Sequence, residues 1–401
     1  MYELNGLYNN AKIFSNKHDE KSDLQIIELL NQKWMENIKI RIMPDFHSGV
    51  GCVIGTTIQI KDKIVPNLVG VDIGCGMYVV DMGKININLE KLDKYINKHI
   101  PSGQNINSKQ IVSFSKINDL KCINKINKDR ALKSIGTLGG GNHFIEIDKS
   151  KNGNVLLIIH SGSRYLGKQV ALYYQENAYK KCIYKDLKIL ETIKQLKHEH
   201  RESEIEDTLI ELKKSSSKIT KHLSYLENED FDNYMHDMKI VQNYASLNRK
   251  TIANKILKYL KIDSESSFET IHNYIDIENM ILRKGAISAN KDEICIIPMN
   301  MRDGCLLCKG KGNEDWNCSA PHGAGRIMSR TKAKENITLS NFEKSMQNIY
   351  SSSVVSSTID ESPMAYKPMD EIIENIKETV TILENIKPIY NFKNKDIKIR
   401  R

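Results

Sequence analysis

The stretch Gly70–Val80, GVDIGCGMYVV, places an acid and a thiol among three glycines just before an apolar run. The glycines permit the backbone angles of a tight loop, which can turn Asp72 and Cys75 toward one point. The run Met77–Val80 predicts a buried strand that holds this loop in place. The pattern indicates a pair of metal ligands on a rigid loop, and a glycine-rich turn with a buried, apolar cysteine is the alternative.

Length, charge and cysteine content favour a large cytoplasmic protein with an anionic partner. A chain of 401 residues can bury a core without disulfides or structural metal, so a bound metal would serve chemistry. The 59 lysines and arginines exceed the 50 aspartates and glutamates, and the net charge of +9 favours RNA, DNA or a nucleotide as partner. The N-terminus lacks the apolar core of a signal peptide, so we expect reduced cysteines and a cytoplasmic location, without a membrane segment.

Two further stretches carry candidate ligands beside predicted strands. In GTLGGGNHFIEI, three glycines open into a strand whose alternation places Asn142 and Glu146 on one face and His143 on the other. In NVLLIIHSGSRYLG, a buried strand ends at His160 and is followed by a helix start, where backbone N–H groups can bind phosphate. The two faces of the first strand can therefore serve different ligands.

These side chains form a mixed set of oxygen, sulfur and nitrogen ligands once His272, beside another short predicted strand, is added. Imidazole and carboxylate suit Mn²⁺ or Zn²⁺, and a thiolate can bridge two adjacent divalent ions. The sequence thus predicts a two-metal centre formed by residues far apart in the chain. Its candidate ligands are Asp72, Cys75, His143, His160 and His272.

The chain has no internal repeat or linker, and its candidate functional residues extend from Asp72 to His322, which favours one composite domain over residues 1–401. The segment at about 184–226 differs from its surroundings, because it combines helical periodicity with dense charge and lacks glycine. It predicts a helical hairpin laid over the core and peripheral to the chemistry. Its histidines are expected on the solvated surface: His198, His200 and His222.

The chain resembles the RtcB-type RNA-splicing ligases from about Ile42 to Lys393, because it contains, in the family's order, PDFHSGVG, VGVDIGCGM, GGGNHFIE, HSGSR, DMKIVQNYASLNR, HNY, RKGAISA and HGAGR. The resemblance implies an α+β fold with a central β-structure flanked by helices. It also implies a ligase that uses GTP and two Mn²⁺ ions to join an RNA 3′-phosphate or 2′,3′-cyclic phosphate to a 5′-hydroxyl, through a histidine–GMP intermediate, in tRNA splicing or RNA repair. We expect a monomer, and leave open which RNA is joined and whether an activating protein partner is needed.

By this resemblance, Cys75 is the thiolate that bridges the two ions. Asp72 and His143 complete the site of one ion, and His160 and His272 complete that of the other. Arginines of the matched motifs are candidates for binding the phosphates of RNA or of the transferred nucleotide. They are Arg164, Arg249, Arg326 and Arg330.

The resemblance also implies that His322, within HGAGR, becomes covalently linked to GMP. A neutral imidazole can attack the α-phosphate of GTP if the phosphate charge is screened, which a neighbouring metal ion does. Glycines around His322 let a nucleotide approach the backbone closely. The residues to which the resemblance assigns nucleotide binding are Asn142, Glu146, His322, Gly323, Ala324, Gly325, Arg326, Tyr366 and Lys393.

Two stretches depart from the family pattern. Pro298–Arg302, PMNMR, stands where the family has a PGSMG-like loop near the triphosphate, which leaves the strictness of the GTP preference open. Family chains end at a lysine followed by glycine, with that lysine in the guanine pocket. Here Lys393 is followed by Asn394 and the basic tail KDIKIRR.

Two other functions use parts of the same residue set. A dinuclear metallophosphoesterase could open cyclic phosphate ends of RNA without ligation, and it would need neither a nucleophilic histidine nor a nucleotide pocket. An RNA-binding module could instead hold a structural zinc ion through Cys305, Cys308, Cys318 and His322. In that arrangement His322 would be a ligand and not a reactive group.

Overall fold

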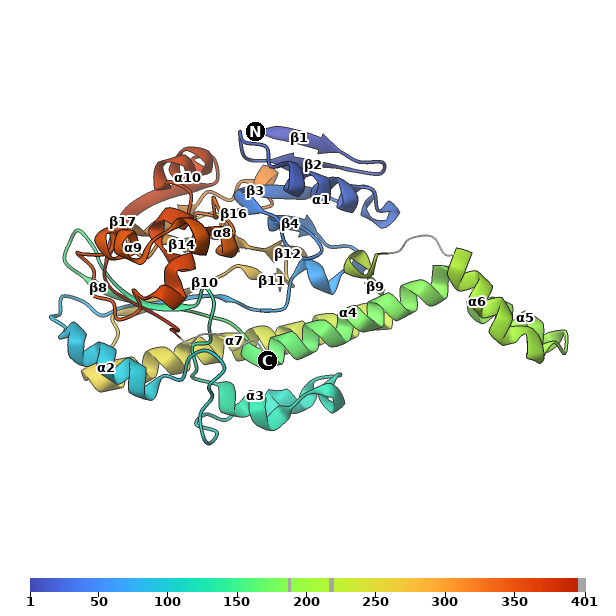
Figure 1. The fold of residues 1–401 in the computed structure, drawn as a ribbon, viewed down its shortest axis with the longest axis horizontal. Coiled ribbons are helices and arrows are strands. Elements are labelled where there is room, and N and C mark those ends of the chain that lie inside the picture. Colours follow the sequence, from blue (N-terminus) through green and yellow to red (C-terminus); the bar gives the residue numbers. More distant parts are fainter. Residues whose placement is uncertain (187–188, 216–219, 396–401) are drawn as a thin grey trace.

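The computed structural model describes residues 1–186, 189–215 and 220–395, in which helices surround two main β-sheets (Figure 1). The α+β class with a central β-structure, expected from the sequence, is confirmed. Beyond Lys395, the basic tail lies outside the described residues. Within the three described ranges, no helix combines the length and the apolar composition that crossing a membrane requires.

The larger sheet has seven strands, and each neighbouring pair is antiparallel. It positions the predicted ligands, because β6 begins directly after Cys75 and β8 carries His160 near its end. In spatial order the strands are β10 (Ser266–Ile271), β6 (Gly76–Asp81), β8 (Val155–Ser161), β7 (Phe144–Lys149), β17 (Val380–Lys393), β15 (Gly304–Gly310) and β14 (Ile294–Asn300).

The smaller sheet has six strands and carries Asp45 and His47 on its third strand. A short β-pair packs against it and continues into the segment that holds His322. In spatial order the six strands are β1 (Tyr2–Asn5), β2 (Asn10–Ile13), β3 (Ile40–His47), β4 (Ile54–Gln59), β12 (Ile281–Lys284) and β11 (Asn273–Asp276). The two short pairs are β13 (Ala286–Ser288) with β16 (Ser319–Pro321), and β5 (Lys63–Ile64) with β9 (Leu226–Glu227).

Strand β7 shows how the larger sheet separates core from site. Ile145 and Ile147 pack with helices α2 (Leu89–His99) and α7 (Glu229–Leu260) in one apolar cluster. Phe144 points to the opposite face, where it joins a second cluster with strand β15. Because side chains alternate along a strand, Glu146 shares the face of Phe144. One face is therefore available for a polar site.

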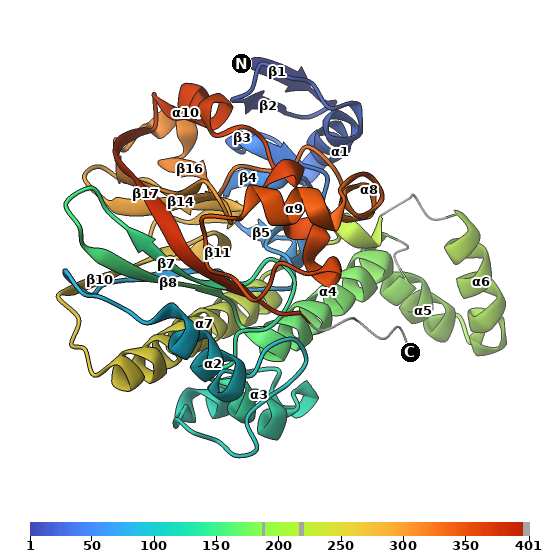
Figure 2. The same cartoon turned by 60° about the vertical axis from the view of Figure 1, so that its left-hand side comes forward.

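Most of the other helices lie around the outside of the two sheets (Figure 2). Helix α1 begins after Asp19, whose side chain accepts a hydrogen bond from the Ser22 N–H and caps the first turn. The remaining helices, in chain order, are α1 (Glu20–Leu30), α3 (Lys128–Ser134), α4 (Arg164–Asp186), α5 (Ile189–His198), α6 (Ile205–Ser215), α8 (Arg330–Asn336), α9 (Leu339–Ser345) and α10 (Met369–Ile376).

The predicted hairpin at about 184–226 is helical, but its position differs from the prediction. Helices α5 and α6 project away from the body at the far end of α4, so they are not laid over the core (Figure 1). Residues 187–188 and 216–219 of this segment lie outside the described residues. His198, His200 and His222 are exposed, as expected. Helical period reveals an amphipathic helix but not the direction in which it leaves the body.

Helix α7 passes directly beneath the Cys75 loop. At Gly74, where φ is +72°, a Cβ atom would lie 2.9 Å from Ala245 Cβ and 3.1 Å from Gln242 Cα. A side chain there would suffer both backbone strain and overlap with the helix. Gly70, at the other end of the loop, has a φ of +96° and no neighbour within 4 Å of such an atom.

We predict that Gly74→Ala lowers the free energy of unfolding by about 1–3 kcal/mol more than Gly70→Ala, because only the first adds overpacking to left-handed strain. Denaturant unfolding of both variants measures the difference. Equal losses would show that α7 yields to the added methyl group and does not fix the loop.

Candidate active site

The loop of residues 70–76 brings Asp72 and Cys75 to the start of β6. The Cys75 N–H donates to the Asp72 carbonyl oxygen at 3.1 Å, which closes a turn. The Cys75 carbonyl oxygen accepts from the N–H of His272 at 2.9 Å. Backbone hydrogen bonds thus place an acid, a thiol and an imidazole together at one end of the larger sheet.

The side chains predicted as metal ligands form one contiguous cluster. His143 Nε2 lies 2.9 Å from Asp72 Oδ2 and 3.4 Å from Cys75 Sγ. His160 Nε2 lies 3.4 Å from the same sulfur and 3.3 Å from His272 Nε2. Cys75 and the three histidines are buried. Nitrogen, sulfur and oxygen donors that converge in this way suit divalent transition metals, with Cys75 at the centre of the set.

Electrostatics explain which ligands are ready to bind a metal ion. Burial lowers the pKa of His160 and His272 well below the ordinary value, so both imidazoles are neutral and offer lone pairs. Burial also raises the pKa of the Cys75 thiol, and the negative charge of Asp72 acts in the same direction. The thiol therefore becomes a ligand by exchanging its proton for a cation.

The backbone selects the tautomer of His143. Its Nδ1 lies 2.9 Å from the carbonyl oxygen of Leu138, which can only accept, so Nδ1 carries the proton. Nε2 faces Asp72 and Cys75, where its lone pair would be available to a cation bound between them. A carbonyl partner on the second ring nitrogen is a common feature of metal-binding histidines.

His322 follows β16 and lies next to the cluster, with 5.1 Å between its ring centroid and that of His272. Its Nδ1 lies 2.6 Å from Oδ2 of Asp45, a fully buried carboxylate on β3. The carboxylate accepts, so Nδ1 carries the proton and Nε2 keeps a lone pair. This arrangement orients His322 as a nucleophile or base. The sequence analysis gave Asp45 no role, because 277 residues separate it from its partner.

A cavity of about 220 Å³ extends from the cluster past His322 to Lys393. All residues predicted to bind the nucleotide line it, together with His47 and the variant segment 298–301. The lining residues that were predicted are Asn142, Glu146, His322, Gly323, Ala324, Gly325, Arg326, Tyr366 and Lys393. The geometry therefore joins the candidate metal site and the candidate nucleotide site in one pocket.

Glu361 organises the far end of this cavity. Its carboxylate accepts from Lys393 Nζ at 2.8 Å and from the Tyr366 hydroxyl at 2.9 Å, and it lies 2.6 Å from Arg330 Nη1. Burial opposes ionisation, but the charges of Lys393 and Arg330 outweigh it and lower the pKa of Glu361 to about 2. Sequence analysis missed Glu361, because an acid in the irregular segment SSTIDESPMAYK carries no periodic signal.

The predicted phosphate-binding arginines occupy different positions. Arg326 and Arg330 line the cavity, where the Arg326 guanidinium stacks 5.1 Å from the Tyr366 ring centroid. Arg164 is partly buried beside the metal cluster and donates to the Thr137 hydroxyl and the carbonyl oxygen of residue 103. Arg326 and Arg330 therefore place positive charge in the cavity lining, whereas Arg164 is not one of the lining residues.

Arg249 is the exception, because it is too deeply buried for the expected contact with RNA phosphate. The side chain is fully buried in α7, and its guanidinium pairs with Glu269 at 3.0 Å. It also donates to the carbonyl oxygens of Gly74 and Ser161 at 2.6 and 2.8 Å. Arg249 therefore ties the Cys75 loop to the end of β8 and has no surface to offer to RNA.

The zinc-module alternative is not supported. Cys305 contacts Glu146, whereas Cys308 packs in a separate apolar cluster. Among the described residues, the groups of closely spaced metal-type side chains do not combine these cysteines with Cys318 or His322. The cysteines are mainly packed side chains.

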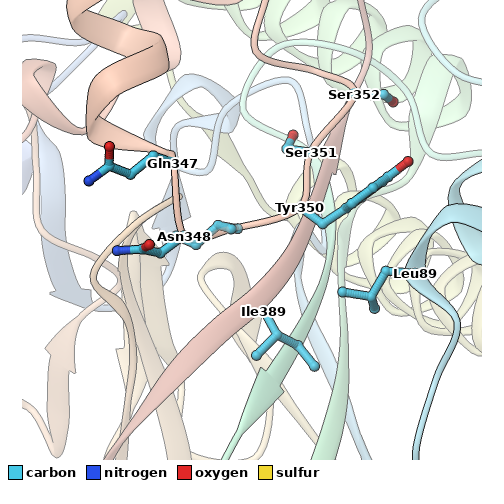
Figure 3. A pocket seen from close by; sticks show the side chains of 8 residues that line it. Leu89, Gln347, Asn348, Tyr350, Ser351, Ser352 and Ile389 are labelled. Carbon is cyan, nitrogen blue, oxygen red and sulfur yellow. The ribbon is translucent and has the colours of Figure 1, made fainter.

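A second hollow lies on the outer side of β17, beside the start of α2 (Figure 3). Figure 3 shows Tyr350 and Leu89 on one side of it and Gln347 and Asn348 on the other. Its lining residues are Leu89, Gln347, Asn348, Ile349, Tyr350, Ser351, Ser352 and Ile389. This lining offers no carboxylate, imidazole or thiol, so the candidate chemistry belongs to the cavity at His322.

Fold and site together are those of an enzyme that combines metal-type ligands, an oriented histidine and a cavity lined by arginine and lysine side chains. The family model described as "tRNA-splicing ligase RtcB" matches residues 25–122 and 113–394. The chain therefore belongs to the RtcB family.

Relatives support the same assignment. The chain is 30% identical to RNA-splicing ligase RtcB1 and 29% identical to RNA-splicing ligase RtcB, from two strains of Escherichia coli, with 87% of this chain and 88% of each relative covered. It is 25% identical to the tRNA-splicing ligase RtcB of Aeropyrum pernix, over 88% of both chains. The similarity spans nearly the whole length of these proteins.

We predict that Cys75→Ala abolishes the binding of Mn²⁺ to the cluster, because the sulfur lies within 3.4 Å of two imidazole nitrogens and is shared by both halves of the ligand set. Cys308→Ala, which removes an equally buried thiol from another core, is the matched control and should leave metal binding intact. Calorimetric titration with Mn²⁺ measures both. Two ions retained by folded Cys75→Ala protein would refute the bridging role.

Proposed function

We propose that this protein is a GTP- and Mn²⁺-dependent RNA ligase that joins a 3′-phosphate or 2′,3′-cyclic phosphate end to a 5′-hydroxyl end through GMP carried on His322. One observation carries the proposal: the oriented His322, His160 of the ligand cluster and the residues of the predicted nucleotide site line the same cavity. Membership of the RtcB family supports it.

The ligand set is suited to two Mn²⁺ ions. Cys75 would be shared, with Asp72 and His143 on one side and His160 and His272 on the other, in keeping with the distances around the sulfur. When bound, the ions would supply positive charge that screens phosphate oxygens from an approaching nucleophile. The neutral imidazoles of His160 and His272 and the ionised Asp72 can bind such ions without losing a proton, whereas the Cys75 thiol would release one.

Within the cavity, each end of the nucleotide has matching groups. Arg326 and Arg330 provide guanidinium donors for phosphate, and Tyr366 and Lys393 line the end near Glu361. Glu146 offers a carboxylate to the N–H groups on the edge of guanine. Asn142 lies beside Lys393, whose Nζ is 3.3 Å from the Asn142 carbonyl oxygen.

The residues then account for a three-step reaction. Asp45 holds Nδ1 of His322, so Nε2 can attack the α-phosphorus of GTP, forming a P–N bond as the bond to pyrophosphate breaks. The RNA 3′-phosphate next takes GMP from His322 and becomes an activated end. Attack by the 5′-hydroxyl oxygen on the activated 3′-phosphorus forms the phosphodiester and releases GMP, the hydroxyl proton passes to solvent, and the surrounding cations stabilise the developing charge. A cyclic phosphate end would first be opened by water to a 3′-phosphate.

The wider setting is inferred from the sequence and the family. We propose that the protein acts in the cytoplasm as a monomer, in tRNA splicing or RNA repair, with an activating protein partner as a further requirement to be tested. The net charge of +9 supports an RNA substrate.

The alternative is a dinuclear metallophosphoesterase that opens cyclic phosphate ends. The Asp45–His322 pair and the cation-rich end around Glu361 disfavour it, because hydrolysis needs neither. Incubation with Mn²⁺, radiolabelled GTP and an RNA with a 2′,3′-cyclic phosphate and a 5′-hydroxyl separates the two. Circularised RNA and acid-labile label on the denatured protein indicate the ligase, whereas opened ends without protein label indicate the esterase.

We predict that His322→Ala forms no GMP adduct and does not ligate a 3′-phosphate end, yet still joins RNA that already carries an activated 3′ end with GMP attached. The reason is that His322 serves only as the carrier of GMP, while the ligand cluster is intact. Gel analysis of both RNAs, with Mn²⁺ binding as the control for the cluster, measures the outcome. Failure on the activated RNA by a metal-binding variant would assign His322 a second role.

For Asp45→Asn we expect a decrease of about 10²–10⁴-fold in the rate of GMP attachment, because the amide can present its N–H₂ group to Nδ1 and select the wrong tautomer. Sealing of pre-activated RNA should change far less. Equal losses in both steps would show that Asp45 supports the whole site and not His322 alone.

A further inference from the structure

Behind the cavity lies a second buried acid that the proposed reaction does not use. Glu146 and Asp148 are two residues apart on β7, so their side chains project from the same face. Glu146 lines the cavity, whereas Asp148 does not and is fully buried behind it. A carboxylate oxygen of each acid and the sulfur of Cys305 all lie within 4.8 Å of one another.

The hydrogen bonds around this pair are unequal, because an amide donor reaches Glu146 and not Asp148. Asn391 Nδ2 donates to Glu146 Oε2, and the Cys305 thiol lies 3.5 Å from Glu146 Oε1. Neither carboxylate oxygen of Asp148 receives a hydrogen bond from another group in the described part of the chain. Apolar side chains pack on the same face, including Leu156, Ile158 and Ile386.

Nearby cations are engaged elsewhere. On β17, Lys393 pairs with Glu361, and Lys387 donates to the carbonyl oxygen of residue 303. The other groups that face the pair are Asn391 on β17 and Cys305 on β15. On β8, Leu156 and Ile158 lie opposite the two acids, and the neutral His160 follows on the same face, opposite Phe144. Two adjacent buried carboxyl groups without a cation cannot both be ionised, so they hold one proton between them.

We propose that Asp148 is a positioning residue that keeps the protein selective for guanine: its carboxyl group retains the shared proton and donates it as a hydrogen bond to Glu146, which stays ionised and faces the base. This inference rests on the proposed function. Guanine presents two N–H donors on one edge, which match a carboxylate. Adenine presents one donor and one acceptor, which match a protonated carboxylic acid instead.

The electrostatics agree with this assignment of the proton. Burial raises the pKa of Asp148 well above its ordinary range, and the charge of Glu146 raises it further. Burial also raises the pKa of Glu146, to about 7, although hydrogen bonds from Asn391 and Asp148 oppose the shift. Glu146 therefore ionises first as the pH rises, and losing the Asp148 donor moves that ionisation to higher pH.

The test measures the binding of GMP and AMP, which lack the leaving group for covalent attachment, by calorimetry between pH 5.5 and pH 8.5. In the unaltered protein we expect a preference for GMP and an affinity for GMP that rises with pH through about 7, as Glu146 ionises. Asp148→Asn keeps a donor of the same shape and should retain the preference and the midpoint.

Asp148→Leu removes the donor, so the midpoint of the pH dependence of GMP affinity should move to higher pH. The ratio of GMP affinity to AMP affinity at pH 7 should fall by about tenfold, which corresponds to a rise of about one unit in the pKa of Glu146. Thermal unfolding and Mn²⁺ titration serve as controls for the fold and the metal cluster. If the leucine variant does not fold, the smaller Asp148→Val is read in the same way.

The outcomes separate this inference from the proposed function. No preference for GMP in the unaltered protein contradicts the guanine pocket itself. If the unaltered protein prefers GMP, and folded Asp148→Leu protein keeps both that preference and the pH midpoint, only the role of Asp148 is overturned. Loss of the preference in folded Asp148→Asn also overturns it, because that variant keeps the hydrogen-bond donor.

Discussion

The site depends on the attachment of the Cys75 loop to helix α7. Gly74 allows the helix to approach, and Arg249 donates from that helix to the carbonyl oxygens of Gly74 and Ser161. The loop and the end of β8 are thereby held by one buried cation, which is itself balanced by Glu269. Because breaking a buried charge pair is costly, this anchor makes the separation between the ligand loop and His160 rigid.

Rigidity matters because the donor atoms of the ligand set must stay close together for a cation to bind them. His160 Nε2 and His272 Nε2 lie 3.3 Å apart, and Cys75 is buried beside Asp72. Neutral imidazoles and a protonated thiol are the forms that burial favours here. Because folding already supplies the free energy needed to order these donors, less free energy is lost when a metal ion binds, and preorganisation favours metal affinity.

Local chemistry made most of the site predictable from the sequence. Metal-type side chains at strand ends and in glycine-rich loops indicated residues such as Cys75 and His143, and these two side chains lie in contact in the structure. Partnerships between distant segments could not be predicted, because no local pattern records them. Asp45 contacts His322 across 277 residues, and Arg249 binds carbonyl groups that any residue could provide. The prediction that the helical hairpin at about 184–226 lies over the core was wrong for a similar reason. Helical periodicity shows which face of a helix is apolar, but it does not show which part of the protein that face contacts.

The cavity contains two kinds of buried acid, and their contrast suggests how its roles are divided. Glu361 is surrounded by Lys393, Arg326 and Arg330, and its pKa falls to about 2. Glu146 has hydrogen-bond donors but forms no ion pair with any residue that the structure describes, and its pKa rises to about 7. Environments that move two carboxyl groups in opposite directions commonly mark different functions in one site. Glu361 holds the surrounding ammonium and guanidinium groups in place, whereas the protonation of Glu146 depends on its hydrogen-bond partners.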